Sequence, residues 1–222
     1  VSNDIERIGF DPVNKFSQYT EGTNITFIND YFNKKAYYEF FRSKKAKVIS
    51  CISMFYDLDN PNAFLSDIKD VLADDGVFVI QQNYLVAMLL QNAFDNIVSE
   101  HIEYYSLFYL ENLLNRHDLE IFQVELNDLN GGSFRTFICH KGKRAIDNSV
   151  LTLRDSEKML QLGKKDIYQA FGERIKVITE TIYDFVKREA ESGKTIYCYA
   201  ASTRGNGLLQ ACRLDKRLVK KA

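Results

Sequence analysis

The sequence predicts an α/β protein: a doubly wound sheet with an antiparallel hairpin at one edge, followed by a truncated second α/β unit. Short apolar runs alternate with helical patterns along the first 141 residues, which is typical of an open α/β sheet. Two later strand-like runs, residues 119–126 and 134–139, flank a glycine-containing turn and predict the hairpin. A strand, a small-residue loop and a helix near the C-terminus indicate the second unit.

Composition is that of an ordinary globular chain. Hydrophobic residues make up 45% and charged residues 27% of its 222 residues, and the net charge is −1. This balance creates no field that would attract nucleic acid or an anionic membrane. The longest apolar run, residues 85–90, is too short to cross a bilayer. We therefore expect neither nucleic acid nor a membrane as a partner.

The four cysteines, Cys51, Cys139, Cys198 and Cys212, are scattered and form no C-x-x-C pair. Two of them lie in apolar strand-like runs, where a free thiol behaves as a small hydrophobic group. The pattern predicts no metal site within these residues. Reduced thiols favour a cytoplasmic location.

Residues 7–11 predict a short buried strand that ends in the carboxylate of Asp11 and is stopped by Pro12. An acidic residue at the tip of the second strand of a doubly wound sheet usually binds a ribose diol; the alternative is a plain turn aspartate. Residues 1–6 are too few for a glycine-rich turn and a crossover helix, which need at least ~10–12 residues. The first βα unit is therefore incomplete, or residues are missing between Asp4 and Ile5.

The middle of the chain gives the remaining elements of the first unit. Strands are expected at residues 25–28, 46–52 and 77–80. Pro61 opens a helix that we expect to close at Asp74-Asp75-Gly76. Two further helices are predicted at residues 84–90 and 107–116.

Between the last two helices, His101 stands among two carboxylates and two tyrosines: Glu100, Glu103, Tyr104 and Tyr105. If this stretch is helical, Glu100, His101 and Tyr104 could share one face, because residues three and four apart are neighbours there. A histidine titrates near neutrality and suits a general base. The alternative is an ordinary surface histidine.

The turn Asn130-Gly131-Gly132 brings the backbone close to another group. We expect this turn to let Ser133 and Arg135 approach a substrate. The alternative is that the two glycines only form the hairpin turn.

The character of the sequence changes after Lys141, so we place a domain boundary between residues 1–141 and 142–222. Residues 141–148 predict a linker, residues 166–191 one long amphipathic helix, and residues 195–199 a strand. Residues 200–207 are a small-residue loop that opens a helix, an arrangement whose free amides can hold phosphate. There Arg204 either binds a diphosphate or is simply solvated.

Four motifs occur in a specific order: ISMFYD at residues 52–57, EHIEYY at 100–105, VELNDLNGGSFR at 124–135 and YAASTRGN at 199–206. Together they resemble the sugar C-methyltransferase family of S-adenosylmethionine-dependent enzymes, and the resemblance covers nearly the whole chain. It implies a class I methyltransferase domain followed by the start of a C-terminal Rossmann-like domain. It also implies zinc only in an N-terminal domain that these residues do not include.

The resemblance implies a role for each matching residue. Asp11 would hold the ribose of the cofactor, Asp4 would lie near its methionine end, and Ser53 and Met54 near its adenine or sulfonium. His101 would be the base, with Glu100 and Tyr104 beside it. We also expect Tyr104 or Arg135 to donate a hydrogen bond to an enolate oxygen. The expected substrate-binding residues are Ser133, Arg135, Tyr199, Arg204 and Asn206.

These observations favour methyl transfer to carbon on a nucleotide-linked keto-sugar. Val98 and Ser99 stand where sugar-methylating members carry a tyrosine and a histidine. One alternative is transfer to oxygen or nitrogen of another small polar substrate, and another is a non-catalytic protein that binds a nucleotide-sugar. The sequence leaves the oligomeric state open.

Overall fold

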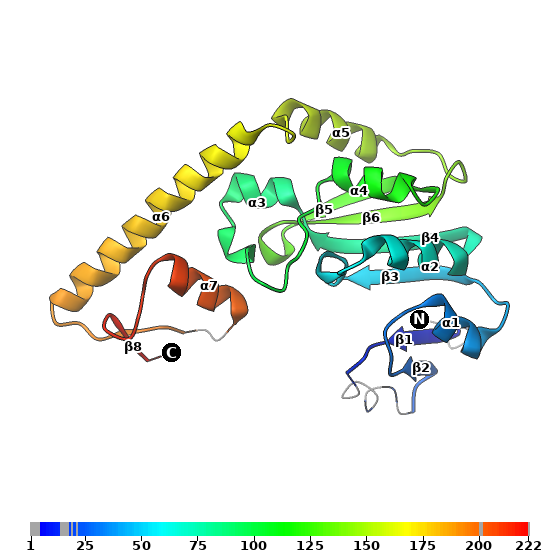
Figure 1. The fold of residues 1–222 in the computed structure, drawn as a ribbon, viewed down its shortest axis with the longest axis horizontal. Helices are drawn as coiled ribbons and strands as arrows, with labels where there is room; N and C mark the ends of the chain where they lie inside the picture. The colour runs from blue at the N-terminus through cyan, green and yellow to red at the C-terminus, as the bar shows by residue number, and fades with distance from the viewer. Residues whose placement is uncertain (1–4, 14–17, 19, 21, 200–201, 222) are drawn as a thin grey trace.

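The computed structural model describes residues 5–13, 18, 20, 22–199 and 202–221, and it has a mixed α/β fold (Figure 1). A four-stranded sheet has the order β3-β4-β6-β5, with β3 and β4 parallel and the other pairs antiparallel. Its strands are β3 (Ala46–Ile52), β4 (Leu72–Asn83), β6 (Ser133–His140) and β5 (Leu119–Asn127). The predicted α/β class and the antiparallel edge hairpin are confirmed.

A second, two-stranded parallel sheet pairs β1 (Arg7–Phe10) with β2 (Ile25–Ile28). It lies beyond the β3 edge of the larger sheet (Figure 1). Helix α1 (Lys34–Phe41) joins the two sheets. Its buried Tyr37 and Phe41 pack with Val71, against Ile8 and Phe10 of β1.

Helix α2 (Pro61–Val71) ends earlier than the sequence predicts, so the expected helix end at Asp74-Asp75-Gly76 is wrong. The pairing of β4 with β3 begins at Leu72, which faces Ala46. It is then interrupted and resumes where Val77 faces Val48. The intervening residues form a bulge inside β4. Gly76 allows it, because a Cβ there would lie 2.8 Å from Cδ1 of Leu72.

The core lies on one face of the larger sheet, where Phe78, Ile80, Phe134 and Ile138 are fully buried. Helices α4 (Leu107–Asn115) and α5 (Asn148–Leu160) pack against β5 and against each other. The sequence predicted α4 but gave no helix at α5. Although α5 follows the expected boundary at residue 141, it packs on the first unit.

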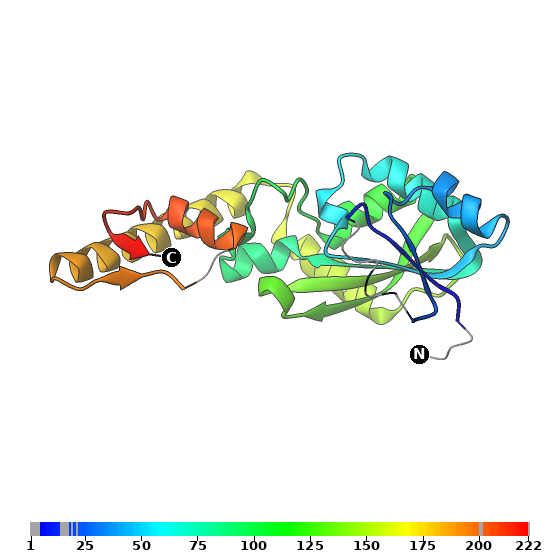
Figure 2. The ribbon, with the colours of Figure 1, turned by 90° about the horizontal axis from the view of Figure 1, so that it is seen from below.

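The C-terminal part begins with α6 (Lys165–Glu191), which extends away from the sheet as one long helix (Figure 1). It is followed by β7 (Ile196–Tyr197), α7 (Thr203–Ala211) and β8 (Val219–Lys221), with β7 and β8 parallel. In Figure 2, α7 lies alongside α6, and the N-terminal end of α7 is the end nearer the four-stranded sheet. The long helix and the strand–loop–helix order are as predicted. Among the described residues, no helix is both long and apolar enough to cross a membrane.

Candidate active site

The segment that carries His101, residues 94–106, connects two helical elements and is here called the His101 loop. It starts with η3 (Phe94–Asn96), a single 3-10 turn, and ends at Ser106, whose hydroxyl caps α4. Between them the chain is irregular. The shared helical face considered for Glu100, His101 and Tyr104 is therefore wrong, and other contacts orient these side chains.

His101 is held by a backbone carbonyl. Its Nδ1 lies 2.8 Å from the carbonyl oxygen of Asn96, and its ring packs edge-on against Tyr56 with centroids 4.5 Å apart. A carbonyl oxygen only accepts hydrogen bonds, so Nδ1 carries a proton, and the neutral form of the ring has its lone pair at Nε2. The hydroxyl of Tyr104 donates to the same carbonyl at 3.4 Å.

Asn96 links three parts of the site. It is 2% exposed, its Oδ1 accepts from Asn83 at 3.0 Å, and its Nδ2 donates to the carbonyl of Asn130 at 3.3 Å. Since that carbonyl can only accept, the orientation of both amides is fixed. The network thereby ties the end of β4 and the turn η4 (Leu129–Gly131) to the His101 loop. Oδ1 of Asn83 is buried without a protein partner in the described structure.

The carboxyl end of β3 supports the loop from the other side. The carbonyl of Tyr56, in η2 (Phe55–Asp57), accepts hydrogen bonds from the amides of Ile102 at 3.1 Å and Glu103 at 3.0 Å. Burial raises the pKa of the Asp57 carboxyl, the charge of His101 acts to lower it, and that of Glu100 to raise it further. Asp57, Glu100 and His101 therefore lie close enough for their charges to interact.

Two cavities border the loop, and Leu85, Met88, Glu103 and Tyr104 line both of them. The smaller is lined by His101 together with Tyr56, Asn83, Tyr84, Glu103 and Tyr104. The larger, of about 580 Å³, is mostly apolar, and its aromatic side chains are Tyr104, Tyr105, Tyr109, Tyr168 and Phe171. Its size is typical of small-molecule sites. Burial raises the pKa of Tyr104, which keeps its hydroxyl a donor at neutral pH.

The predicted cofactor residues follow strands β1 and β3. Asp11 comes directly after β1, and its Oδ1 accepts from the amide of Val13 at 2.7 Å. Ser53, after β3, has a φ of 53°, a left-handed conformation that is uncommon outside glycine and often marks functional sites. Met54 beside it is 37% exposed. Asp11 follows a strand of the two-stranded sheet, whereas Ser53 and Met54 follow a strand of the four-stranded sheet. Asp4 lies outside the described residues.

The residues predicted to bind substrate are dispersed. The hydroxyl of Ser133 donates to the carbonyl of Leu129 at 2.8 Å. Arg135 donates to Gln81 and Glu125 on neighbouring strands. Tyr199 and Asn206 are exposed on the C-terminal part.

Gly132 explains the close backbone approach predicted for the glycine pair. Its φ is 107°, and a Cβ there would lie 2.4 Å from that of Ala87 in α3 (Leu85–Gln91). The hairpin turn thus packs directly on α3.

Arg204 does contact the site loop. Its Nε and Nη2 donate to Oδ2 of Asp95 in η3, at 2.9 and 2.5 Å. The guanidinium predicted to bind a diphosphate is thus paired with a carboxylate in this structure.

Comparison with known proteins identifies the family. The methyltransferase domain family matches residues 3–124, and the C-methyltransferase C-terminal domain matches residues 128–222. The chain belongs to the methyltransferase family. This membership confirms the family that the sequence motifs resemble.

Among curated proteins, the C-methyltransferase NovU of Streptomyces niveus is 28% identical over 176 residues. That match covers 79% of this chain and 42% of the relative, so the chain spans less than half of that protein.

Similar solved structures include a protein of Pyrococcus horikoshii, with 17% identity, a TM-score of 0.49, and coverage of 62% of this chain and 73% of that one. LepI in complex with S-adenosylmethionine has 13% identity, a TM-score of 0.48, and coverage of 61% and 36%. The magnesium protoporphyrin IX methyltransferase of Synechocystis, with bound S-adenosylhomocysteine, has 10% identity, a TM-score of 0.43, and coverage of 59% and 62%.

In the described part of the chain, no group of three or more His, Cys, Asp or Glu side chains could hold a metal ion.

Proposed function

We propose that this chain transfers a methyl group from S-adenosylmethionine to a carbon beside the carbonyl of a nucleotide-linked keto-sugar, with His101 as the general base. One observation carries the proposal: the Asn96 carbonyl holds the proton on Nδ1 of His101, 2.8 Å away. This arrangement leaves Nε2 as the basic atom. The C-terminal match to C-methyltransferases supports transfer to carbon.

The residues around His101 supply what carbon methylation needs. Nε2 takes a proton from the carbon next to the carbonyl, and the electron pair of that C–H bond forms an enolate. The hydroxyl of Tyr104 is available to donate to the enolate oxygen, because its present bond to Asn96 is long, at 3.4 Å. S-adenosylmethionine supplies an electrophilic methyl group. The new C–C bond forms as the S–C bond breaks, which leaves S-adenosylhomocysteine and a protonated His101.

The same chain would hold the cofactor through residues after its parallel strands. The second carboxylate oxygen of Asp11 is suited to accept hydrogen bonds from the ribose hydroxyls, while Val13 keeps the first oxygen in place. Ser53 and Met54 would border the adenine or the sulfonium. Asp11 and His101 thereby have separable roles, one in cofactor binding and the other in chemistry.

Calorimetric titration with S-adenosylhomocysteine tests the cofactor site. We expect the unmodified chain to bind and Asp11→Asn to bind at least about tenfold more weakly, through loss of a charge-assisted hydrogen bond. Asp59→Asn, in the exposed turn before α2, is the matched control and should bind like the unmodified chain. A folded chain that does not bind the product would overturn the proposal.

Transfer of a labelled methyl group to nucleotide-linked keto-sugars tests the base. We expect His101→Gln to lower kcat by about 10²–10⁴, the usual contribution of a general base, with unchanged affinity for S-adenosylhomocysteine. His117→Gln is the control, because His117 bonds to Asn62 outside the site. Full activity of His101→Gln would exclude His101 as the base. Methylated oxygen or nitrogen in the product would favour the alternative acceptor.

A further inference from the structure

We propose that Arg204 is a positioning residue: its ion pair with Asp95 fixes η3 so that the Asn96 carbonyl holds His101 in its basic tautomer. The expected effect on catalysis rests on the proposed role of His101 as the base. The effect of the ion pair on the tautomer of His101 is independent of that role. It assigns the C-terminal part of the chain a function in shaping the active site.

The pair joins residues 109 positions apart in the sequence. Two guanidinium nitrogens donate to one oxygen of Asp95, and the side chains of Arg204 and Asp95 are only 33% and 29% exposed. A charge-assisted bond of this kind, partly withdrawn from solvent, is stronger and more directional than a neutral one. It therefore restricts the orientation of η3.

Helix α7 reaches the same loop through a second contact. A Cβ on Gly207 would lie 3.8 Å from Cγ1 of Val98 and 3.9 Å from the carbonyl oxygen of Ile97. One on Gly131 would lie 4.0 Å from Nη2 of Arg204. Arg204 thus lies between η3 and the η4 turn, with α7 against the next residues of the loop.

Asp95 acts on His101 through its neighbour. Asp95 and Asn96 are consecutive residues of a three-residue 3-10 turn, so a rotation of that turn changes the direction of the Asn96 carbonyl. That carbonyl is the partner of Nδ1 of His101. Which imidazole nitrogen is protonated depends on the bond that the other one makes. Release of Asp95 should therefore let the two tautomers of His101 mix.

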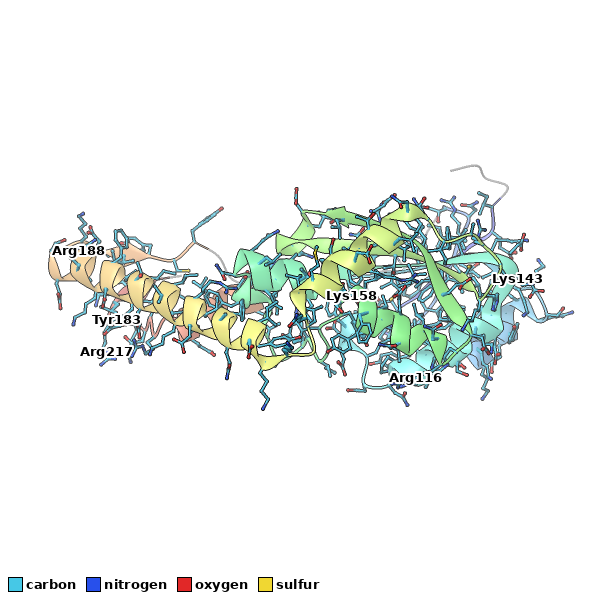
Figure 3. The ribbon with its side chains drawn as sticks, turned by 90° about the horizontal axis from the view of Figure 1, so that it is seen from above. Arg116, Lys143, Lys158, Tyr183, Arg188 and Arg217 are labelled. Atoms are coloured by element: carbon cyan, nitrogen blue, oxygen red, sulfur yellow. The ribbon has the colours of Figure 1, made fainter. Side chains whose placement is uncertain are left out.

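Nitrogen NMR of the whole chain labelled with ¹⁵N-histidine, at a pH where the ring is neutral, tests the structural step. The unmodified chain should show His101 protonated at Nδ1 alone. Arg204→Gln and Asp95→Asn should each give a mixture of tautomers. Arg217→Gln is the control: Arg217 also pairs with an aspartate, Asp215, but it lies near Tyr183 toward the far end of α6 (Figure 3).

Kinetics test the consequence. Arg204→Gln should lower kcat about tenfold, within the range of coupled neighbouring sites, and leave the KM for S-adenosylmethionine unchanged. Arg204→Lys should recover part of the loss, because it keeps the charge without the fork. Combining Arg204→Gln with Asp95→Asn should be no worse than either change alone.

The outcomes separate this inference from the proposed function. An unaltered His101 spectrum in both Arg204→Gln and Asp95→Asn overturns the positioning role. If the tautomers mix in those variants while His101→Gln stays fully active, the ion pair positions the loop but His101 is not the base.

Discussion

The His101 loop is attached at both ends to helices that follow it in the chain, α7 at its start and α5 at its end, and the two attachments differ in burial. At its start, Asp95 pairs with Arg204 of α7, and about a third of each side chain is exposed. At its end, Glu157 of α5 is 4% exposed. The Glu157 carboxylate accepts from the amides of Leu107 at 2.6 Å and Phe108 at 2.9 Å, and from the hydroxyl of Tyr84 at 2.8 Å.

Because of this difference in burial, we expect the Glu157 attachment to stabilise the fold and the Arg204 attachment to position the loop. The Glu157 carboxylate satisfies backbone amides at the N-terminus of α4, where the helix has no partners of its own and favours negative charge. Removing the Glu157 carboxylate leaves buried donors without an acceptor, which lowers the free energy of unfolding. The partly exposed Arg204 pair contributes less free energy, since water still competes for both charges. We expect the Arg204–Asp95 pair to affect the orientation of η3 within the His101 loop rather than overall stability.

The largest effect is expected from Glu157→Ala. The change leaves two buried donors and one partly buried donor without their acceptor and opens a cavity, so we expect a loss of about 3 kcal/mol in the free energy of unfolding. Urea denaturation followed by circular dichroism measures it. Glu173→Ala, on an exposed position of α6, is the control and should change stability by less than about 0.5 kcal/mol. A small loss for Glu157→Ala would remove the contrast between the two attachments.

An intermediate effect is expected from Tyr84→Phe, which removes one of the three donors to Glu157. We expect a loss of about 1 kcal/mol near pH 8.

The pH dependence sharpens this prediction. Burial, together with the adjacent Glu157 charge, raises the pKa of Tyr84 above its ordinary value of 10.0. Above that value the unfolded chain releases the phenolic proton while the folded chain keeps it, so the stability conferred by Tyr84 is lost as pH rises above about 10. Urea midpoints measured from pH 8 to 11 should therefore fall less steeply in Tyr84→Phe. Tyr183→Phe, toward the far end of α6 (Figure 3), should retain the slope of the unmodified chain.

The same contrast shows what could be predicted from the sequence. Helix α6 follows from its regular apolar spacing, but α5 does not, because Glu157 occupies the buried stripe formed by Val150 and Leu153. The motif around His101 marked this segment as a candidate site, although its residues do not form a helix. It gave no sign of Asn83 and Asn96, since asparagines distant in sequence carry no spacing signal, nor of Asp95, whose partner is more than a hundred residues away. Such contacts depend on how the elements pack.

The smallest effect on stability is expected from Arg204→Gln. Loss of a partly exposed ion pair should cost less than about 1 kcal/mol, and the difference from the unmodified chain should shrink as salt rises from 0.05 to about 1 M. Urea denaturation at both salt concentrations measures it, with Arg217→Gln as the exposed-pair control. A loss as large as that of Glu157→Ala would mean that α7 is part of the cooperative core. Impaired methyl transfer in Arg204→Gln would then reflect unfolding of the loop rather than its orientation.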